Sequence, residues 1–318
     1  MSDLILSVRN LRVVFPHRHG ELVPIDDISF DIRRGEIIGF VGESGAGKSM
    51  TGAAIIGLID PPGYIDRGEI WLGGERIDQQ VSDPASRIRG KRISMVFQDP
   101  LTSLNPLRTI GDQLVETIQT HLMIGGDQAR RKAIAGLEEV GIDPGRFGAY
   151  PHEFSGGMRQ RVVIALALCA EPELIIADEP TTALDVSVQA QVLELLKRLC
   201  QERGASVMLI THDMGVIAET TDRVAVLYAG RLAEIGPTAT LLTQPKHPYT
   251  RGLIASTPSV ETGDINTKLF QIPGVMPRLD ALPAGCRFHP RCEHVLARCE
   301  HEQPQLIAGT ACFLYDDE

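Results

Sequence analysis

Short runs of apolar residues recur along the chain and alternate with segments whose apolar residues repeat at helical spacing. Residues 28–32 alternate apolar and polar positions, the pattern of a half-buried strand. Uninterrupted apolar runs, which are typical of strands buried on both faces, occupy residues 37–41, 174–177, 207–210 and 224–227. Helical patterns cover residues 48–58, 186–199 and most of 108–150. This alternation of strands and helices predicts an α/β fold with a largely parallel sheet.

The alternation of strand and helix patterns ends near residue 236, and prolines become frequent. Gly236 and Pro237 are followed by prolines at positions 245, 248, 258, 273, 277, 283, 290 and 304. A segment so rich in loop-forming residues does not fit the strand and helix alternation of the preceding chain. We therefore expect a first domain over residues 1–235 and a separate, loop-rich C-terminal extension over residues 236–318.

Composition and charge narrow the range of functions. The 318 residues carry a formal net charge of −10, which argues against a nucleic-acid partner because nucleic-acid binders present a basic surface. The first residues have neither the basic flank nor the apolar core of a signal peptide. The longest apolar run, residues 162–170, is far shorter than the roughly 20 residues of a membrane-spanning helix. We expect a cytosolic chain that reaches a membrane only through a partner.

The first chemical motif lies between the apolar run at 37–41 and the helical pattern at 48–58. It consists of Gly42, Glu43, Ser44, Gly45, Ala46, Gly47, Lys48 and Ser49, and Met50 follows it. This is the P-loop pattern, in which glycines let successive backbone N–H groups face phosphate oxygens and the next helix adds its positive end. Lys48 is expected to contact the β- and γ-phosphates, and the Ser49 hydroxyl to bind Mg²⁺. The whole stretch, Met50 included, is predicted to bind ATP.

A second motif is a pair of acids, Asp178 and Glu179, at the end of the apolar run at 174–177. Asp178 is expected to hold the Mg²⁺ shell. Glu179 is expected to polarise the attacking water as a general base. Acidic strand ends also occur without such a role, so the functional interpretation depends on the P-loop earlier in the chain.

A Ser155-Gly156-Gly157 sequence opens another helical pattern. Backbone N–H groups at such a helix start can bind an anion, although an ordinary N-cap turn that contains glycine would have the same sequence pattern. With its neighbours the stretch resembles the signature of ABC-type ATPases, Leu-Ser-Gly-Gly-Gln. Phe154 and Met158 depart from that form, whereas the Ser-Gly-Gly centre is intact.

The resemblance to ABC nucleotide-binding domains covers about residues 4–235. It implies a P-loop NTPase fold with a helical subdomain that carries the signature, at about residues 99–165. It also implies that two such domains enclose two ATP molecules. Each ATP would contact the P-loop of one subunit and the Ser-Gly-Gly of the other, so closure of the dimer would depend on ATP.

Further residues match motifs of this family in the expected order. Gln98 resembles the glutamine that contacts Mg²⁺ and the lytic water and couples to the membrane subunit. Residues 183–185, ending in Asp185, resemble the loop that crosses the dimer interface. His212 resembles the histidine that contacts the γ-phosphate. Phe15 matches the aromatic residue that stacks on adenine, although a core aromatic of a strand is nearly as good an interpretation. The resemblance thus implies a catalytic set of Glu179, His212, Gln98 and Lys48.

One branch of the family is more similar than the others, the ATPase subunits of bacterial dipeptide and oligopeptide importers. The resemblance rests on residues 98–106, residues 178–186 and the sequence His247-Pro248-Tyr249-Thr250. It implies peptide uptake through two integral-membrane permease subunits, with a second homologous ATPase and a periplasmic or extracellular peptide-binding protein. The chain would lie on the cytoplasmic face of the inner membrane. Alternatives are another cargo, such as nickel, an oligosaccharide or an antimicrobial peptide, or a non-transport ABC ATPase.

The six cysteines fall into two groups. Cys169 and Cys200 lie within apolar helical patterns and are interpreted as core thiols. The other four are Cys286, Cys292, Cys299 and Cys312. Four thiolates suit Zn²⁺ or an iron–sulfur cluster, and spacings wider than those usual for zinc favour a [4Fe–4S] cluster slightly. Free thiols or disulfides remain alternatives.

The resemblance to peptide-importer ATPases favours the [4Fe–4S] cluster more strongly than spacing does. Three nearby histidines could replace a cysteine ligand, namely His289, His294 and His301. Such a cluster would be structural, because a loop-rich segment of this size has little hydrophobic core of its own and a bound metal centre would stabilise its fold.

Overall fold

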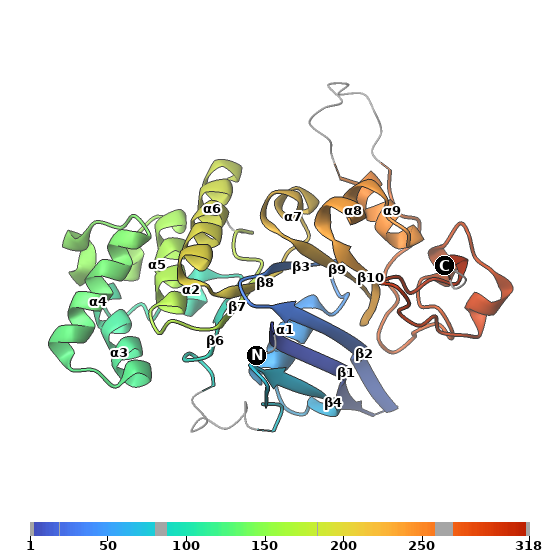
Figure 1. Cartoon of the computed structure of the whole chain (residues 1–318), viewed down its shortest axis with the longest axis horizontal. Coiled ribbons are helices and arrows are strands. Elements are labelled where there is room, and N and C mark those ends of the chain that lie inside the picture. The colour runs from blue at the N-terminus through green and yellow to red at the C-terminus, as the bar shows by residue number, and fades with distance from the viewer. Residues whose placement is uncertain (1–2, 19, 80–87, 183, 258–269, 316–318) are drawn as a thin grey trace.

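The computed structural model describes residues 3–18, 20–79, 88–182, 184–257 and 270–315. Figure 1 shows three parts along the long axis of the molecule: a helical part, a central part with two sheets, and the C-terminal extension at the opposite end. The central part therefore contacts both of the others, and the site described below is built on it.

The central sheet has the strand order β10-β9-β3-β8-β7-β6. Its strands are β3 (Ile37–Val41), β6 (Ile93–Val96), β7 (Leu174–Asp178), β8 (Ser206–Ile210), β9 (Arg223–Tyr228) and β10 (Arg231–Pro237). All neighbours pair in parallel except β10, which is antiparallel to β9. Every residue of β3 and β8 is buried, which explains their uninterrupted apolar sequences. The predicted α/β fold is confirmed.

A second sheet is antiparallel and has the order β2-β1-β4-β5. Its strands are β1 (Leu4–His17), β2 (Gly20–Arg33), β4 (Tyr64–Leu72) and β5 (Glu75–Arg76). The alternating pattern at 28–32 places Ile28, Phe30 and Ile32 in a core shared with β3. Helix α1 (Lys48–Ile56) packs between the two sheets. It ends two residues before the predicted position, since Gly57 takes a left-handed conformation (φ 70°) that terminates helices.

The helical part confirms the helical pattern predicted over most of residues 108–150. It contains α2 (Pro100–Ser103), α3 (Ile110–Leu122), α4 (Gly126–Glu139), α5 (Gly156–Leu168) and the 3₁₀ turns Pro144–Gly148 and Pro151–Glu153. Helices α6 (Val186–Arg203) and α7 (Met214–Thr220) follow β7 and β8, and α6 shares the apolar core of α5. The extent of the signature subdomain, about residues 99–165, remains a prediction.

The C-terminal extension is mostly irregular, as its prolines predict. Its regular elements are α8 (Thr238–Thr243), α9 (Pro248–Ala255) and the 3₁₀ turns His289–Arg291, Ala297–Glu300 and Phe313–Tyr315. Tyr249 and Phe288 are buried against Tyr228 of β9, with ring centroids 4.6 and 5.1 Å away. The extension therefore shares a core with the central sheet. The boundary proposed at residue 235 falls within β10 and remains a prediction, as do the domain limits 1–235 and 236–318.

Candidate nucleotide site

The predicted P-loop connects the end of β3 to the start of α1. Gly42 and Gly47 have φ angles of 151° and 103°, which side chains other than glycine rarely adopt. A Cβ atom at Gly42 would lie 2.3 Å from the carbonyl oxygen of Leu227, and one at Gly47 would lie 2.8 Å from that of Pro24. The glycines therefore let the loop pass close to neighbouring backbone while α1 begins directly at Lys48.

Lys48 lies under this loop and is buried. Its Nζ donates hydrogen bonds to the carbonyl oxygens of Gly42 (2.8 Å) and Glu43 (3.1 Å). Burial lowers the pKa of the Lys48 amine, and the carboxylates of Glu179, Asp178 and Glu43 oppose that shift. These acids therefore favour the charged form of Lys48, which is the form that binds phosphate.

Ser49 and Asp178 meet at the carboxyl end of β7. The Ser49 hydroxyl donates to Oδ1 of Asp178 at 2.8 Å. Burial raises the pKa of the Asp178 carboxyl, against the hydrogen bond from Ser49. A hydroxyl and a carboxylate at this distance fit Mg²⁺, which prefers oxygen ligands and completes its shell with water and phosphate oxygens.

Glu179 is in contact with two of the other predicted catalytic residues. Its Oε2 accepts hydrogen bonds from Gln98 Nε2 (3.0 Å) and from the Thr182 hydroxyl (2.9 Å). Its Oε1 lies 3.3 Å from His212 Nδ1. Glu179 itself has φ 45° and donates its backbone N–H to Ile210, so the strand end fixes its carboxylate. Thr182 was not predicted, although it lies in the residues 178–186 that carry the resemblance.

Lys48, Ser49, Gln98, Glu179 and His212 line one cleft of about 690 Å³, within the usual range of ligand sites, whereas Asp178 lies outside its described lining. Its described lining is Pro24, Ser44, Gly45, Ala46, Gly47, Lys48, Ser49, Met50, Gln98, Glu179, His212 and Leu279. Pro24 and Leu279 were missed by sequence reasoning, because neither belongs to a motif. Phe15 is absent from the described lining and packs instead beside Gly63 and the central core. Its predicted contact with adenine stays a prediction.

The signature residues lie at the start of α5. Ser155 is the N-cap of this helix, and its hydroxyl accepts from the backbone N–H of Met158. Gly157 lies close to α6, since a Cβ atom there would be 2.5 Å from Val188 Cγ1. Ser155, Gly156 and Gly157 are not part of the described lining of the cleft. Their predicted contact with a nucleotide therefore stays a prediction.

Asp185 is the N-cap residue of α6. It also lies outside the described lining of the cleft. Ala183, in the same predicted interface loop, is outside the described residues. The role of this loop therefore stays a prediction.

All six cysteines are free thiols. Cys169 and Cys200 are buried, and burial raises the pKa of both to about 12, as expected for core thiols. Burial also raises the pKa of Cys286 to about 11, with smaller effects from Cys299, Cys312 and Cys292. The other three thiols therefore lie near enough to Cys286 to affect its pKa.

The predicted metal centre is not borne out by this arrangement. Within the described part of the chain, no three His, Cys, Asp or Glu side chains are placed to hold a metal ion. His289, one of the alternative ligands, directs Nδ1 to the carbonyl oxygen of Cys286 at 2.9 Å. The described residues therefore show neighbouring thiols and no assembled metal site.

Among the described helices, none combines the length and apolar character needed to cross a bilayer.

Comparisons with known proteins agree with this geometry. Residues 25–182 match the family described as ABC transporter, and residues 233–299 match the oligopeptide/dipeptide transporter C-terminal region. A dimeric ATP-binding cassette, MJ0796, solved in a post-hydrolysis state with ADP and Pi, is 27% identical with a TM-score of 0.66. The match covers 74% of this chain and 99% of that one.

Curated relatives match over nearly the whole chain. The oligopeptide transport ATP-binding protein AppD of Bacillus subtilis (strain 168) is 45% identical over 100% of this chain and 98% of its own. The dipeptide transport ATP-binding protein DppD of the same organism is 47% identical over 99% and 96%. The probable D,D-dipeptide transport ATP-binding protein DdpD of Escherichia coli (strain K12) is 45% identical over 98% and 94%. The chain therefore belongs to the family of ATP-binding proteins of ABC-type oligopeptide and dipeptide transporters.

Proposed function

We propose that this chain is the ATPase subunit of an ABC importer and couples MgATP binding and hydrolysis to the uptake of dipeptides or oligopeptides. The observation that carries the proposal is the single cleft around Lys48, in which Gln98, Glu179 and His212 converge. It occurs in a chain that matches both the ATPase and the peptide-transporter C-terminal families.

The P-loop and its neighbours would bind the nucleotide. Residues 42–50 would surround the phosphates with backbone N–H groups, and Lys48 would exchange its hydrogen bonds to Gly42 and Glu43 for phosphate oxygens. Ser49, Asp178 and Gln98 would hold Mg²⁺, which neutralises charge on the β- and γ-phosphates. Phe15 remains the proposed contact of adenine.

Glu179 would act on the attacking water. The hydrogen bonds from Gln98 and Thr182 fix Oε2, which leaves Oε1 beside His212 to accept a proton. Water attacks the γ-phosphorus, its proton passes to Glu179, and the bond to the ADP oxygen breaks, so that ADP and phosphate result. His212, with its side chain 61% exposed, can contact the γ-phosphate from the open side of the cleft.

A second nucleotide-binding subunit would complete the site. Ser155, Gly156 and Gly157 would contact the ATP held by the partner's P-loop, and Asp185 would lie at the interface. Their position outside the cleft supports this arrangement, as does the dimeric state of the related cassette. We propose a homologous second ATPase as the partner, so that the pair is a heterodimer.

The remaining partners would be two integral-membrane permease subunits and an external peptide-binding protein. This chain would bind the permeases peripherally, at the cytoplasmic face of the inner membrane. The alternative cargoes, nickel, an oligosaccharide or an antimicrobial peptide, would change the permeases and the binding protein rather than the cleft.

For the four cysteines of the extension we propose a [4Fe–4S] cluster, with Zn²⁺ as the alternative. Supporting the fit, backbone N–H groups of His294 and Leu296 donate to the sulfurs of Cys292 and Cys299, both at 3.4 Å. Anaerobically purified protein should contain iron and acid-labile sulfide and absorb broadly in the visible range. Zinc without iron would support the alternative, and protein free of both metals would refute a metal centre.

The proposed function is tested in proteoliposomes that contain the complete transporter. Lys48→Met should abolish both ATP hydrolysis and uptake of a labelled peptide. Lys197→Met is the matched control, because Lys197 is a half-buried residue of α6 outside the described lining of the cleft, and its Nζ donates to the carbonyl oxygen of Glu219. Transport of nickel or an oligosaccharide without peptide would refute a peptide cargo. ATP hydrolysis that persists in Lys48→Met would refute the assignment of the cleft as the nucleotide site.

A further inference from the structure

The C-terminal extension reaches the P-loop through one buried ion pair. Arg291 donates from Nη1 to Glu43 Oε2 at 2.6 Å and from Nη2 to Glu43 Oε1 at 3.0 Å. The guanidinium is only 5% exposed, whereas the Glu43 carboxylate is 31% exposed. A bidentate pair of this kind fixes both the position and the orientation of the carboxylate.

The same arginine is itself held firmly within the extension. Its Nε donates to the carbonyl oxygen of Pro273 at 2.7 Å, and Nη1 also donates to the Tyr228 hydroxyl at 3.3 Å. The hydrogen bonds from Arg291 thus link Glu43, β9 and the loop at residue 273. Because Pro273 and Tyr228 hold the guanidinium in place, Arg291 would lose these two hydrogen bonds if it followed a movement of Glu43.

Glu43 is held at its backbone as well. Its N–H donates to the hydroxyl of Tyr249 at 2.8 Å, and Tyr249 is fully buried at the start of α9. His247 caps this helix by accepting the Tyr249 N–H on Nδ1. The sequence His247-Pro248-Tyr249 therefore has a structural purpose, which is to aim the Tyr249 hydroxyl at the P-loop.

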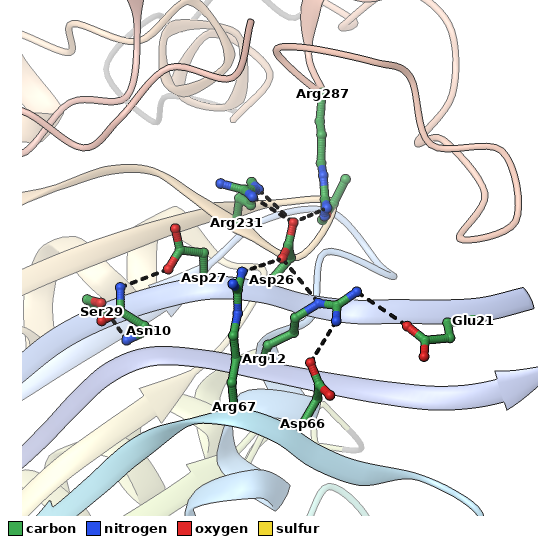
Figure 2. Close-up of polar contacts among 11 residues, drawn as sticks. Asn10, Arg12, Glu21, Asp26, Asp27, Ser29, Asp66, Arg67, Arg231 and Arg287 are labelled. Carbon is green, nitrogen blue, oxygen red and sulfur yellow. Dashed lines mark hydrogen bonds and ion pairs between the residues drawn. The ribbon is translucent and has the colours of Figure 1, made fainter.

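A second contact joins the extension to β2, which is linked to the P-loop by backbone hydrogen bonds. Figure 2 shows Arg287 reaching down to Asp26 of β2, where Arg231 also binds. The Arg287 pair measures 2.6 Å, and the backbone N–H of Asp26 donates to Gly230, whose N–H in turn donates to Ala46 of the P-loop. Leu279, also from the extension, lines the cleft itself.

The charge of Glu43 gives this arrangement a consequence for nucleotide binding. Glu43 belongs to the loop proposed to surround the triphosphate, and an unpaired carboxylate there would repel the phosphates and attract Lys48. Arg291 neutralises the carboxylate and holds it away, on the side of the extension. We propose that Arg291 is a positioning residue of the nucleotide site, through which the C-terminal extension sets the affinity for ATP. The inference rests on the proposed ATPase function.

Two substitutions separate this role from simple structural support. Arg291→Met removes the charge and leaves Glu43 unpaired, so MgATP binding should weaken about tenfold, or about 1.4 kcal/mol. Glu43→Gln in the Arg291→Met background removes the unpaired charge, so most of the lost affinity should return. Arg291→Lys keeps the charge without the bidentate geometry and should fall between wild type and Arg291→Met.

The control is Arg251→Met in the same extension. Arg251 donates to the carbonyl oxygen of Pro245 and to the Tyr315 hydroxyl, much as Arg291 does to Pro273 and Tyr228, but it holds no P-loop carboxylate. Its loss should leave ATP affinity unchanged. Thermal unfolding of every variant shows whether each protein remains folded.

Affinity is measured on the full chain by titration with a non-hydrolysable ATP analogue and Mg²⁺. Wild-type affinity in Arg291→Met would overturn the inference, and so would a double variant as weak as Arg291→Met, since the effect would then not act through Glu43. Lys48→Met is included as a comparison. If this variant loses ATP binding while Arg291→Met keeps wild-type affinity, the result refutes the role of Arg291 and leaves the proposed nucleotide site intact. Wild-type protein that binds no nucleotide would instead refute the proposed function.

Discussion

Replacing Glu179 by glutamine tests the assignment of the general base with the least disturbance of the cleft. The Gln98 amide and the Thr182 hydroxyl both donate to Oε2, and the amide oxygen of a glutamine can accept both bonds. The amide nitrogen would replace Oε1 beside His212 Nδ1, where it can donate to the neutral ring. The substitution therefore keeps the contacts and removes the basicity together with the negative charge.

The expected size of the effect follows from that geometry. Loss of a general base costs about 10²–10⁴-fold in turnover, which corresponds to about 3–5 kcal/mol in the barrier. Binding should behave differently, because Glu179 lies beside the proposed triphosphate and Lys48 is unchanged. One negative charge fewer should leave the affinity for MgATP equal or higher.

The measurements are phosphate release by the assembled transporter and ATP binding by the isolated chain. Glu202→Gln is the matched control, since Glu202 is exposed on α6 and pairs only loosely with Arg198 at 3.9 Å. Turnover within threefold of wild type would refute the role of Glu179. Loss of ATP binding together with turnover would show instead that the carboxylate supports the structure of the cleft.

Two further predictions concern stability. Burial lowers the pKa of His247 to about 4, from 6.5. The unfolded chain therefore takes up a proton below pH 6.5 that the native imidazole does not, so this contribution to stability is complete above pH 6.5 and declines toward pH 4. Wild-type protein should therefore lose unfolding free energy between pH 7 and pH 4.5. In His247→Asn, whose side chain can still accept the Tyr249 N–H, this loss should be smaller by about 2–3 kcal/mol. Parallel pH profiles of unfolding free energy for the two proteins would contradict the prediction. Gly157→Ala places a Cβ atom 2.5 Å from Val188 Cγ1 and should destabilise the nucleotide-free protein by about 1 kcal/mol in denaturant unfolding. The double variant Gly157→Ala/Val188→Ala should recover this stability, and a double variant that does not recover it would contradict the prediction.

Four strands of the central sheet and the chemistry at the ends of β3 and β7 were predictable from local sequence, whereas β6 and β10 were not predicted. A strand buried on both faces needs an unbroken apolar run, and β3, β7, β8 and β9 each have one. Asp178 and Glu179 directly follow one such run, and Lys48 follows another after the P-loop, so parallel pairing brings them to one edge of the sheet. Gln98 and His212 could be added only through the resemblance, because a single glutamine or histidine carries no local signal.

Contacts made by the C-terminal extension were not predictable in the same way. Arg291 reaches Glu43 across 248 positions of sequence, and Leu279 enters the cleft from a loop without periodicity. Side chains in irregular segments are placed by tertiary packing, here by Tyr249 and Phe288 against Tyr228. From the sequence alone, the extension is therefore expected to be a separate segment that a bound metal centre stabilises.

The contacts of Arg287 and Arg291 with Asp26 and Glu43 would give the extension a closer relation to the nucleotide site than a separate segment would have. Arg287 binds Asp26 of β2, Arg291 binds Glu43 of the P-loop, and both arginines lie between Cys286 and Cys292. A change in the backbone of that segment would therefore act on Asp26 and Glu43 together. Glu43 belongs to the loop that would bind phosphate, and Asp26 is linked to it through Gly230. If Arg291 has the proposed role, the stability of the cysteine-bearing segment and the affinity for ATP are coupled. Ligand binding should then stabilise this segment by the same free energy with which the segment favours the ligand.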